Sequence, residues 1–299
     1  MHELNNLENM EMTELASGSL QKMKVEHGEP VNDYLPVNYY LRVGEAKIHL
    51  NPYLGKHLRI ESKGAIRCIH CDRLTKTSFN QGYCFPCFKS LAQCDRCIMS
   101  PELCHYAQGT CRQPEWGEQN CFQEHIVYLA NSSGLKVGIT RHNQVPVRWI
   151  DQGAVAAVPV FSVSSRYLSG LLEVMLKQWV ADKTNWRKML KHELEVIDLP
   201  AEKQRLLGLA ASQIQALQAQ YPGEITCLQD ARLWQFDYPA LVWPTKIVTH
   251  NLDKQAVVEG VLQAVKGQYL IFDTGCLNVR KFTAYEVAVT GDQSNLESK

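Results

Sequence analysis

The middle of the chain alternates between apolar and polar residues on both sides of a short polar turn, a pattern that predicts a β-hairpin. The two strands are expected over residues 126–130 and 135–140, around an Asn-Ser-Ser-Gly turn. A third strand is predicted over residues 158–164. Apolar residues then recur at intervals of three and four over residues 168–182, which predicts an amphipathic helix. Residues 201–220, after Pro200, predict a second strong helix.

Short alternating runs between glycines and prolines predict β-rich modules on both sides of this central region. One module is expected over residues 19–66 and another over residues 223–290, and the two are expected to pack together as one discontinuous β-domain. Residues 1–18 are predicted to be a flexible N-terminus because they are polar and acidic, and residues 291–299 a disordered tail.

Residues 67–124 carry nine of the eleven cysteines and predict a metal-binding module. Two CxxC pairs, Cys68-Ile-His-Cys71 and Cys84-Phe-Pro-Cys87, lie about a dozen residues apart, which is typical of a four-thiolate zinc site. Each pair turns tightly enough to direct two sulfurs at one tetrahedral ion. The predicted ligands of a first zinc ion are therefore Cys68, Cys71, Cys84 and Cys87.

The remaining cysteines of this module are spaced less regularly and predict a second zinc ion. Its expected ligands are Cys94, Cys97, Cys104 and Cys111, with Cys121 or His125 as an alternative to either of the last two. An iron–sulfur cluster requires the same thiolates, so the spacing does not distinguish it from zinc. Both sites are expected to be structural, because all-cysteine ligation leaves no open position for a substrate or a water.

The overall composition bears on two questions: whether the chain binds nucleic acid, and in which cellular compartment it is found. The 31 basic residues are balanced by 31 acidic ones, which argues against a broad charged surface for nucleic acid but leaves room for a local patch. Residues 1–20 lack an apolar segment behind a basic start, and no segment approaches the ~20 apolar residues of a membrane span. Eleven cysteines without an export signal favour a reducing compartment, so the protein is expected in the cytoplasm, away from membranes.

Polar side chains follow one another in a distinctive order through the central region. Ile126-Val127-Tyr128 lies in the first predicted strand and Lys136-Val137-Gly138 in the second, and Arg148, Glu173 and Asn185 follow on or beside helices. Over residues 126–185 this order resembles the GIY-YIG nuclease superfamily, whose members include homing endonucleases and the incision subunit of bacterial nucleotide-excision repair. Ile126 stands where that family has glycine and Lys136 where it has tyrosine. Over nearly its full length the chain also resembles an uncharacterised bacterial family of unknown function, which implies no activity.

The GIY-YIG resemblance implies a metal-dependent endonuclease that hydrolyses phosphodiester bonds of DNA or RNA. Glu173 would hold one Mg²⁺ or Mn²⁺, and Arg148 would clamp the scissile phosphate. Tyr128 would activate water, with its pKa lowered by Lys136, and Asn185 would anchor a helix end.

The hairpin register tests this interpretation, because side chains alternate between the two faces of a strand. With the five-residue connection 131–135, Tyr128 opposes Gly138 and shares a face with Lys136. With the four-residue connection 131–134, the two side chains point apart.

Each of these residues also has an ordinary structural interpretation. Tyr128 is then a half-buried strand residue, Lys136 a solvated one and Asn185 a helix cap. Arg148 pairs with Asp151, and Glu173 pairs with Lys177 four residues along its helix.

Two other functions follow from that interpretation. One is a non-catalytic, zinc-dependent nucleic-acid-binding protein, in which the basic residues around the zinc loops contact phosphates. These residues are Arg67, Arg73, Lys76, Lys89 and Arg96. The other is a protein-interaction adaptor. In all three cases the predicted fold class is α+β, with a Cys-rich zinc-binding module over residues 67–124 and a GIY-YIG-like three-stranded antiparallel sheet with helices over residues 125–222. A β-rich module from the two termini completes it.

Overall fold

The computed structural model describes residues 12–180 and 185–294, and these residues form two compact units. Unit 1 takes its residues from the ranges 1–28, 36–85 and 238–299, and unit 2 from the ranges 29–35 and 86–237. Strands and helices both contribute, so the expected mixture of the two is confirmed.

Unit 1 is built on an antiparallel sheet with strand order β13-β12-β11-β4-β14-β1-β2, in which β3 pairs with β2 and β5 with β4. Its strands are β1 (Met12–His27), β2 (Tyr34–Val43), β3 (Ala46–His49), β4 (His57–Arg67), β5 (Leu74–Thr75), β11 (Val257–Lys266), β12 (Tyr269–Phe272), β13 (Gly275–Asn278) and β14 (Tyr285–Asp292), with 3-10 turns η1 (Asn51–Tyr53) and η7 (Val279–Phe282). In β4, Ile60 faces Val258 of β11 on one side and Val289 of β14 on the other. Strands from both ends of the chain therefore share one sheet.

The prediction of a flexible N-terminus over residues 1–18 is wrong for residues 12–18. Residues 12–18 form the first half of β1 and pair with β14, from Met12 opposite Asp292 to Gly18 opposite Val287. A polar segment forms a strand here because β14, more than 260 residues away in sequence, supplies the hydrogen-bonding partners. At the other end, β14 extends to Asp292. Residues 1–11 and 295–299 lie outside the described residues.

Unit 2 is built on a second antiparallel sheet, of order β10-β8-β6-β7, with β9 also paired to β8. Its strands are β6 (His125–Asn131), β7 (Leu135–Arg141), β8 (Ala156–Val163), β9 (Ile225–Cys227) and β10 (Trp234–Asp237). Its helices are α2 (Pro114–Cys121), α3 (Val147–Asp151), α4 (Arg166–Lys177), α5 (Trp186–Leu190), α6 (Leu199–Leu209) and α7 (Ala211–Gln220). Five 3-10 turns complete it: η2 (Ala92–Cys94), η3 (Arg96–Ile98), η4 (Pro101–Leu103), η5 (Tyr106–Gln108) and η6 (His142–Gln144).

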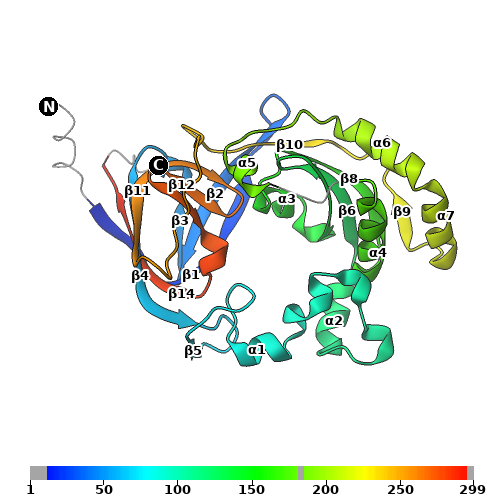
Figure 1. Ribbon diagram of the computed structural model, residues 1–299, viewed down its shortest axis with the longest axis horizontal. Coiled ribbons are helices and arrows are strands. Elements are labelled where there is room, and N and C mark those ends of the chain that lie inside the picture. The colour runs from blue at the N-terminus through cyan, green and yellow to red at the C-terminus, as the bar shows by residue number, and fades with distance from the viewer. Residues whose placement is uncertain (1–11, 181–184, 295–299) are drawn as a thin grey trace. The chain divides into compact units, whose positions relative to one another are not determined.

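The predicted hairpin and third strand are confirmed as β6, β7 and β8. In the hairpin Tyr128 opposes Gly138 and Ala130 opposes Lys136, which is the register that places Tyr128 and Lys136 on one face. Helix α4 follows β8 and lies along the sheet (Figure 1). Its stripe of Leu168, Leu172 and Leu176 belongs to the same buried core as Val127 and Leu129 of β6, because strand residues on either side of Tyr128 face away from it.

Two details of unit 2 differ from the sequence analysis. The single helix expected over residues 201–220 is two helices, α6 and α7, that meet at Ala210. Gly208 weakens the last turn of α6, which favours a break there. Residues 223–237, expected in the C-terminal β-module, instead extend the sheet of unit 2 through Cys227 opposite Phe161 and Trp234 opposite Ala157.

Helix length also bears on the expected absence of a membrane span. Within residues 12–180 and 185–294, no helix combines the length and the apolar character that crossing a bilayer requires.

Candidate functional site

The first thiol cluster consists of Cys68, Cys71, Cys84 and Cys87, whose sulfurs all lie within 4.8 Å of one another. Cys68 directly follows β4, and Cys84 directly precedes α1 (Phe85–Ser90), whose first turn carries Cys87. The Sγ atoms of Cys71 and Cys84 are 3.7 Å apart. These are the four ligands predicted from the CxxC pairs, and their arrangement can hold a metal ion such as zinc.

The backbone around the first thiol cluster favours the thiolate form that binds metal. Burial opposes ionisation of Cys68, but hydrogen bonds from the backbone of Cys84, Cys71 and His70 outweigh it and lower the pKa of this thiol to about 6. The other three sulfurs lie within 4.8 Å of it and of one another, so a bound cation would be stabilised by all four. Because four sulfurs fill a tetrahedral shell, such an ion would have a structural role.

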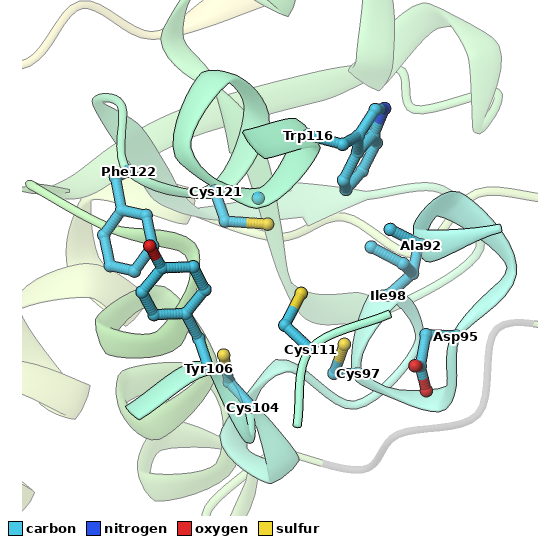
Figure 2. Close-up of a pocket in the computed structure, with 11 residues that line it drawn as sticks. Ala92, Asp95, Cys97, Ile98, Cys104, Tyr106, Cys111, Trp116, Cys121 and Phe122 are labelled. Atoms are coloured by element: carbon cyan, nitrogen blue, oxygen red, sulfur yellow. The ribbon is translucent and has the colours of Figure 1, made fainter. Parts of the chain in front are cut away.

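A second group of sulfurs surrounds a small cavity in unit 2. Cys97, Cys104, Cys111 and Cys121, called here the second thiol cluster, line a space of about 20 Å³. Figure 2 shows their sulfurs turned towards this common space, with Tyr106 and Phe122 on one side and Trp116 on another. Burial raises the pKa of Cys97 to about 11, and charge on Asp95 and on the other three cysteines acts in the same direction. The four sulfurs are therefore close enough to influence one another electrostatically.

The structure separates two other predicted ligands from this cavity. Cys94 ends η2 and is 7% exposed. It is not one of the described residues that line the cavity. His125 begins β6 and is completely buried, with Nδ1 2.7 Å from the carbonyl oxygen of Gln123. Burial lowers the pKa of His125 to about 4, so the ring is neutral at pH 7.

Tyr128, the first of the predicted catalytic residues, lies in β6 of unit 2. Its side chain is completely buried, and its ring meets Trp149 of α3 edge-on at a centroid distance of 5.5 Å. Its hydroxyl donates a hydrogen bond to Oε1 of Gln152 at 3.0 Å. Burial raises the pKa of Tyr128 to about 12; Arg148 lowers it by charge and by a hydrogen bond, and the charge of Glu173 raises it. Arg148 and Glu173 are thus both within electrostatic range of Tyr128.

The pKa of Tyr128 corrects the expected role of Lys136. A lowered pKa was predicted, but enclosure of the phenol by Trp149 and the sheet removes the water that would stabilise a phenolate. Lys136 does share a face with Tyr128 and is half-buried. The cation that acts most strongly on Tyr128 is nevertheless Arg148.

Close packing of Tyr128 against Gly138 explains why the second motif ends in glycine. A Cβ atom at this position would lie 2.6 Å from both Cζ and Oη of Tyr128, far inside the ~3.5–4.0 Å that is the optimal separation of two carbon atoms. The ring of Tyr128 therefore occupies the space above the Gly138 backbone, and the two motifs depend on each other through packing.

The last two residues of the predicted site have ordinary partners. Glu173 forms an ion pair with Lys177 at 3.4 Å, and its side chain is 14% exposed. Asn185 is exposed and caps α5, accepting hydrogen bonds from the backbone of Arg187 at 3.0 Å and Lys188 at 3.2 Å. The structure thus brings Tyr128, Arg148 and Glu173 together, whereas Asn185 stabilises a helix end.

Two residues near this group were missed in the sequence analysis. Gln152 lies four positions after Arg148, a helical spacing that signals a shared face and could have identified it. Arg166 lies at the start of α4, and burial lowers the pKa of its guanidinium group; the charges of Cys121, Arg148, Cys97 and Glu173 also act on it. No local pattern signals this position, because its neighbours come from four separate segments.

The comparisons with known proteins identify a family but no activity. A family model described as "Protein of unknown function (DUF2797)" matches residues 55–287. No curated protein and no solved structure matches the chain. The resemblance to GIY-YIG nucleases therefore stays a prediction.

Proposed function

The chain belongs to the DUF2797 family, whose description states no function, and we propose that unit 2 is a GIY-YIG-like domain that binds nucleic acid and hydrolyses its phosphodiester bonds with a divalent metal ion. The observation that carries the proposal is the electrostatic linkage of Tyr128, Arg148 and Glu173. These residues come from β6, α3 and α4, and they follow one another in the order that the resemblance implies.

Arg148 is the residue proposed to bind the scissile phosphate. It is half-buried at the start of α3, so its guanidinium group is held by the protein yet reachable from solvent. A planar guanidinium group donates two parallel hydrogen bonds to phosphate oxygens, which fixes the orientation of the ester.

Glu173 is the residue proposed to hold the metal ion. Its carboxylate is partly exposed and is paired with Lys177 on its own helix, an exchangeable contact that a cation could replace. A single hard carboxylate is compatible with Mg²⁺ or Mn²⁺, which keep several water ligands. Such an ion supplies charge neutralisation at the phosphate and a more acidic water.

Tyr128 is proposed to orient Arg148 and to act in its protonated form. With a pKa of about 12 the phenol keeps its proton at neutral pH, so it serves as a hydrogen-bond partner. Its bond to Gln152 and its contact with Trp149 fix the hydroxyl in place.

A second candidate function, nucleic-acid binding without turnover, is supported by the complete burial of Tyr128. In a binding protein this side chain needs no access to substrate. Exposed basic residues in the loop between Cys71 and Cys84, Arg73 and Lys76, are available for phosphate contacts in either case.

The test compares cleavage and binding in the same set of variants. Labelled single-stranded and duplex DNA and RNA are incubated with zinc-loaded protein, with or without added Mg²⁺ or Mn²⁺; no chelator is used, because it would also remove zinc. Glu173→Gln is expected to abolish turnover while affinity measured by fluorescence anisotropy stays within a few-fold. Arg148→Ala is expected to lower turnover about 10²–10³-fold and to weaken binding. Glu202→Gln, which alters a partly exposed glutamate on α6 paired with Arg205, is the matched control and is expected to change neither.

The outcomes separate the candidate functions. Metal-independent background cleavage equal in all variants would refute the nuclease proposal. Salt-dependent binding that Arg148→Ala weakens, with no turnover by the unaltered protein on any of the substrates, would establish the second candidate in its place. An absence of salt-dependent affinity for nucleic acid would refute both candidate functions and leave the protein-interaction adaptor.

A further inference from the structure

We propose that Cys97, Cys104, Cys111 and Cys121 bind a second zinc ion in unit 2. This site lies outside the proposed nuclease group and is independent of whether that group is active. Its ligand set differs from the one that spacing predicted, because Cys121 takes the place of Cys94.

The cavity between the four sulfurs has the size of a single atom. Its volume of about 20 Å³ slightly exceeds the ~10–15 Å³ that one water molecule needs. A water there would require two or more polar partners, whereas the walls are formed mainly by sulfurs, aromatic rings and aliphatic groups (Figure 2). Four sulfurs that line one atom-sized space can close around a zinc ion as its tetrahedral ligands.

The four cysteines come from separate turns, so the cavity is a product of tertiary structure. Cys97 lies in η3, Cys104 follows η4, Cys111 follows the turn after η5, and Cys121 ends α2. A segment of this kind needs a cross-link, because its buried residues between positions 92 and 121 are few and small. They are Ala92, Cys94, Pro101 and Gly117. Metal binding supplies the free energy that such a core lacks.

The ligand atoms of a competing set, Asp95, Cys97 and His105, lie within 4.8 Å of one another, whereas the four sulfurs do not all lie that close. Its two non-sulfur members already have protein partners. Asp95 forms an ion pair with Nε of Arg112 at 2.8 Å and accepts a hydrogen bond from the backbone of Arg96 at 2.6 Å. His105 has Nδ1 2.8 Å from Oγ1 of Thr110 and Nε2 3.4 Å from Asp95. These contacts keep Asp95 and His105 as a hydrogen-bonded frame beside Cys97.

Arg166 provides charge compensation for the proposed site. A zinc ion with four thiolates retains a net negative charge, and such centres are stabilised by nearby hydrogen-bond donors and cations. The charges of Cys121 and Cys97 act directly on the guanidinium group of Arg166. That group also donates a hydrogen bond to the carbonyl oxygen of Ile98, next to Cys97, at 2.5 Å.

The proposed ion would also hold the loop against which α4 packs. Gly170 of α4 lies so close to η4 that a Cβ atom would be 2.6 Å from the backbone nitrogen of Glu102 and 2.7 Å from Cβ of Pro101. Because η4 leads directly into Cys104, zinc binding at this ligand fixes the surface on which α4, and with it Glu173, is positioned.

The first experiment measures metal content. Full-length protein is purified in the presence of zinc and a thiol reductant, and zinc per chain is measured by plasma mass spectrometry and native mass spectrometry. We expect two zinc ions per chain in the unaltered protein and one in each of two variants, Cys121→Ser and Cys71→Ser. The matched control Cys94→Ser is expected to keep two.

Three results would overturn the proposal. They are one zinc per chain in the unaltered protein, iron with acid-labile sulfide, and loss of an ion from Cys94→Ser but not from Cys121→Ser. X-ray absorption of the unaltered protein gives an answer that does not depend on the folding of any variant. We expect only sulfur ligands at about 2.3 Å. A nitrogen or oxygen shell at about 2.0–2.2 Å would assign the second ion to Asp95 and His105, or to His125, and refute the four-thiolate site.

Discussion

Replacing Gly138 by alanine tests the packing that joins the two strand motifs. The new Cβ would lie 2.6 Å from Cζ and Oη of Tyr128, about 1 Å inside an ordinary carbon contact. The ring cannot simply move away, because it is completely buried and rests against Trp149. Overpacking of this kind costs about 1–3 kcal/mol. In a unit of this size each kcal/mol lowers the melting temperature by about 2–4 °C.

Differential scanning calorimetry suits this measurement, because it resolves separate transitions when two units unfold independently. Gly208→Ala is the matched control: a Cβ at Gly208, in α6, meets no atom within 4 Å. That variant is expected to gain about 0.5–1 kcal/mol from the better helix propensity of alanine. In a Tyr128→Leu background residue 128 lacks the ring atoms that would clash. Gly138→Ala is therefore expected to lower the free energy of unfolding much less in that background.

Two results would count against this reasoning. A Gly138→Ala variant that melts within ~1 °C of the unaltered protein would mean that Tyr128 does not lie over the Gly138 backbone. An equal cost of the substitution with tyrosine or leucine at position 128 would assign the effect to the backbone instead of the ring.

Three further predictions concern α4, acid stability and metal removal. Gly170→Ala should lower the melting temperature and the zinc occupancy of the second thiol cluster, because its Cβ would press on Pro101 and Glu102; full occupancy at unchanged stability would contradict this. Acidification from about pH 6.5 to pH 4 should destabilise unit 2, because the pKa of buried His125 is lowered to about 4 and the unfolded chain binds a proton first. Calorimetry over this range should show that the melting temperature of unit 2 depends less on pH in His125→Gln than in the unaltered protein. An equal pH dependence in the two proteins would exclude the histidine as the cause. Removal of zinc by a chelator should make residues 68–87 sensitive to proteolysis, since the first thiol cluster holds this stretch together; an unchanged digestion pattern would argue against a structural ion there.

Much of the fold could be predicted from local pattern. The hairpin was predicted because alternation and turn residues are properties of adjacent positions. Its register was left open between a four-residue and a five-residue connection, and the structure shows the pairing that the five-residue connection implies. The first thiol cluster was predicted for the same reason, since each CxxC pair sets its own geometry. Helix α4 was recognisable from its apolar stripe, although residues 181 and 182 of the expected helix lie outside the described part of the chain.

Other features depended on residues that are distant in sequence. Residues 12–18 form a strand only because β14 lies beside them. Residues 225–237 join unit 2 because both β9 and β10 pair with β8. The set of cysteines that lines the second cavity likewise depends on α2, which brings Cys121 to the sulfurs of Cys97, Cys104 and Cys111 and leaves Cys94 aside.

The sequence by itself determined which chemical groups are present and how neighbouring positions are arranged: paired thiols, a tyrosine in one strand, a glycine in the next. Only the tertiary structure decided the state of those groups. Tyr128 has a pKa of about 12 instead of a lowered one because Trp149 encloses it. The physical reason is that periodicity and turn geometry arise from contacts within a few residues. Burial and electrostatic interaction, in contrast, depend on which remote segments pack together.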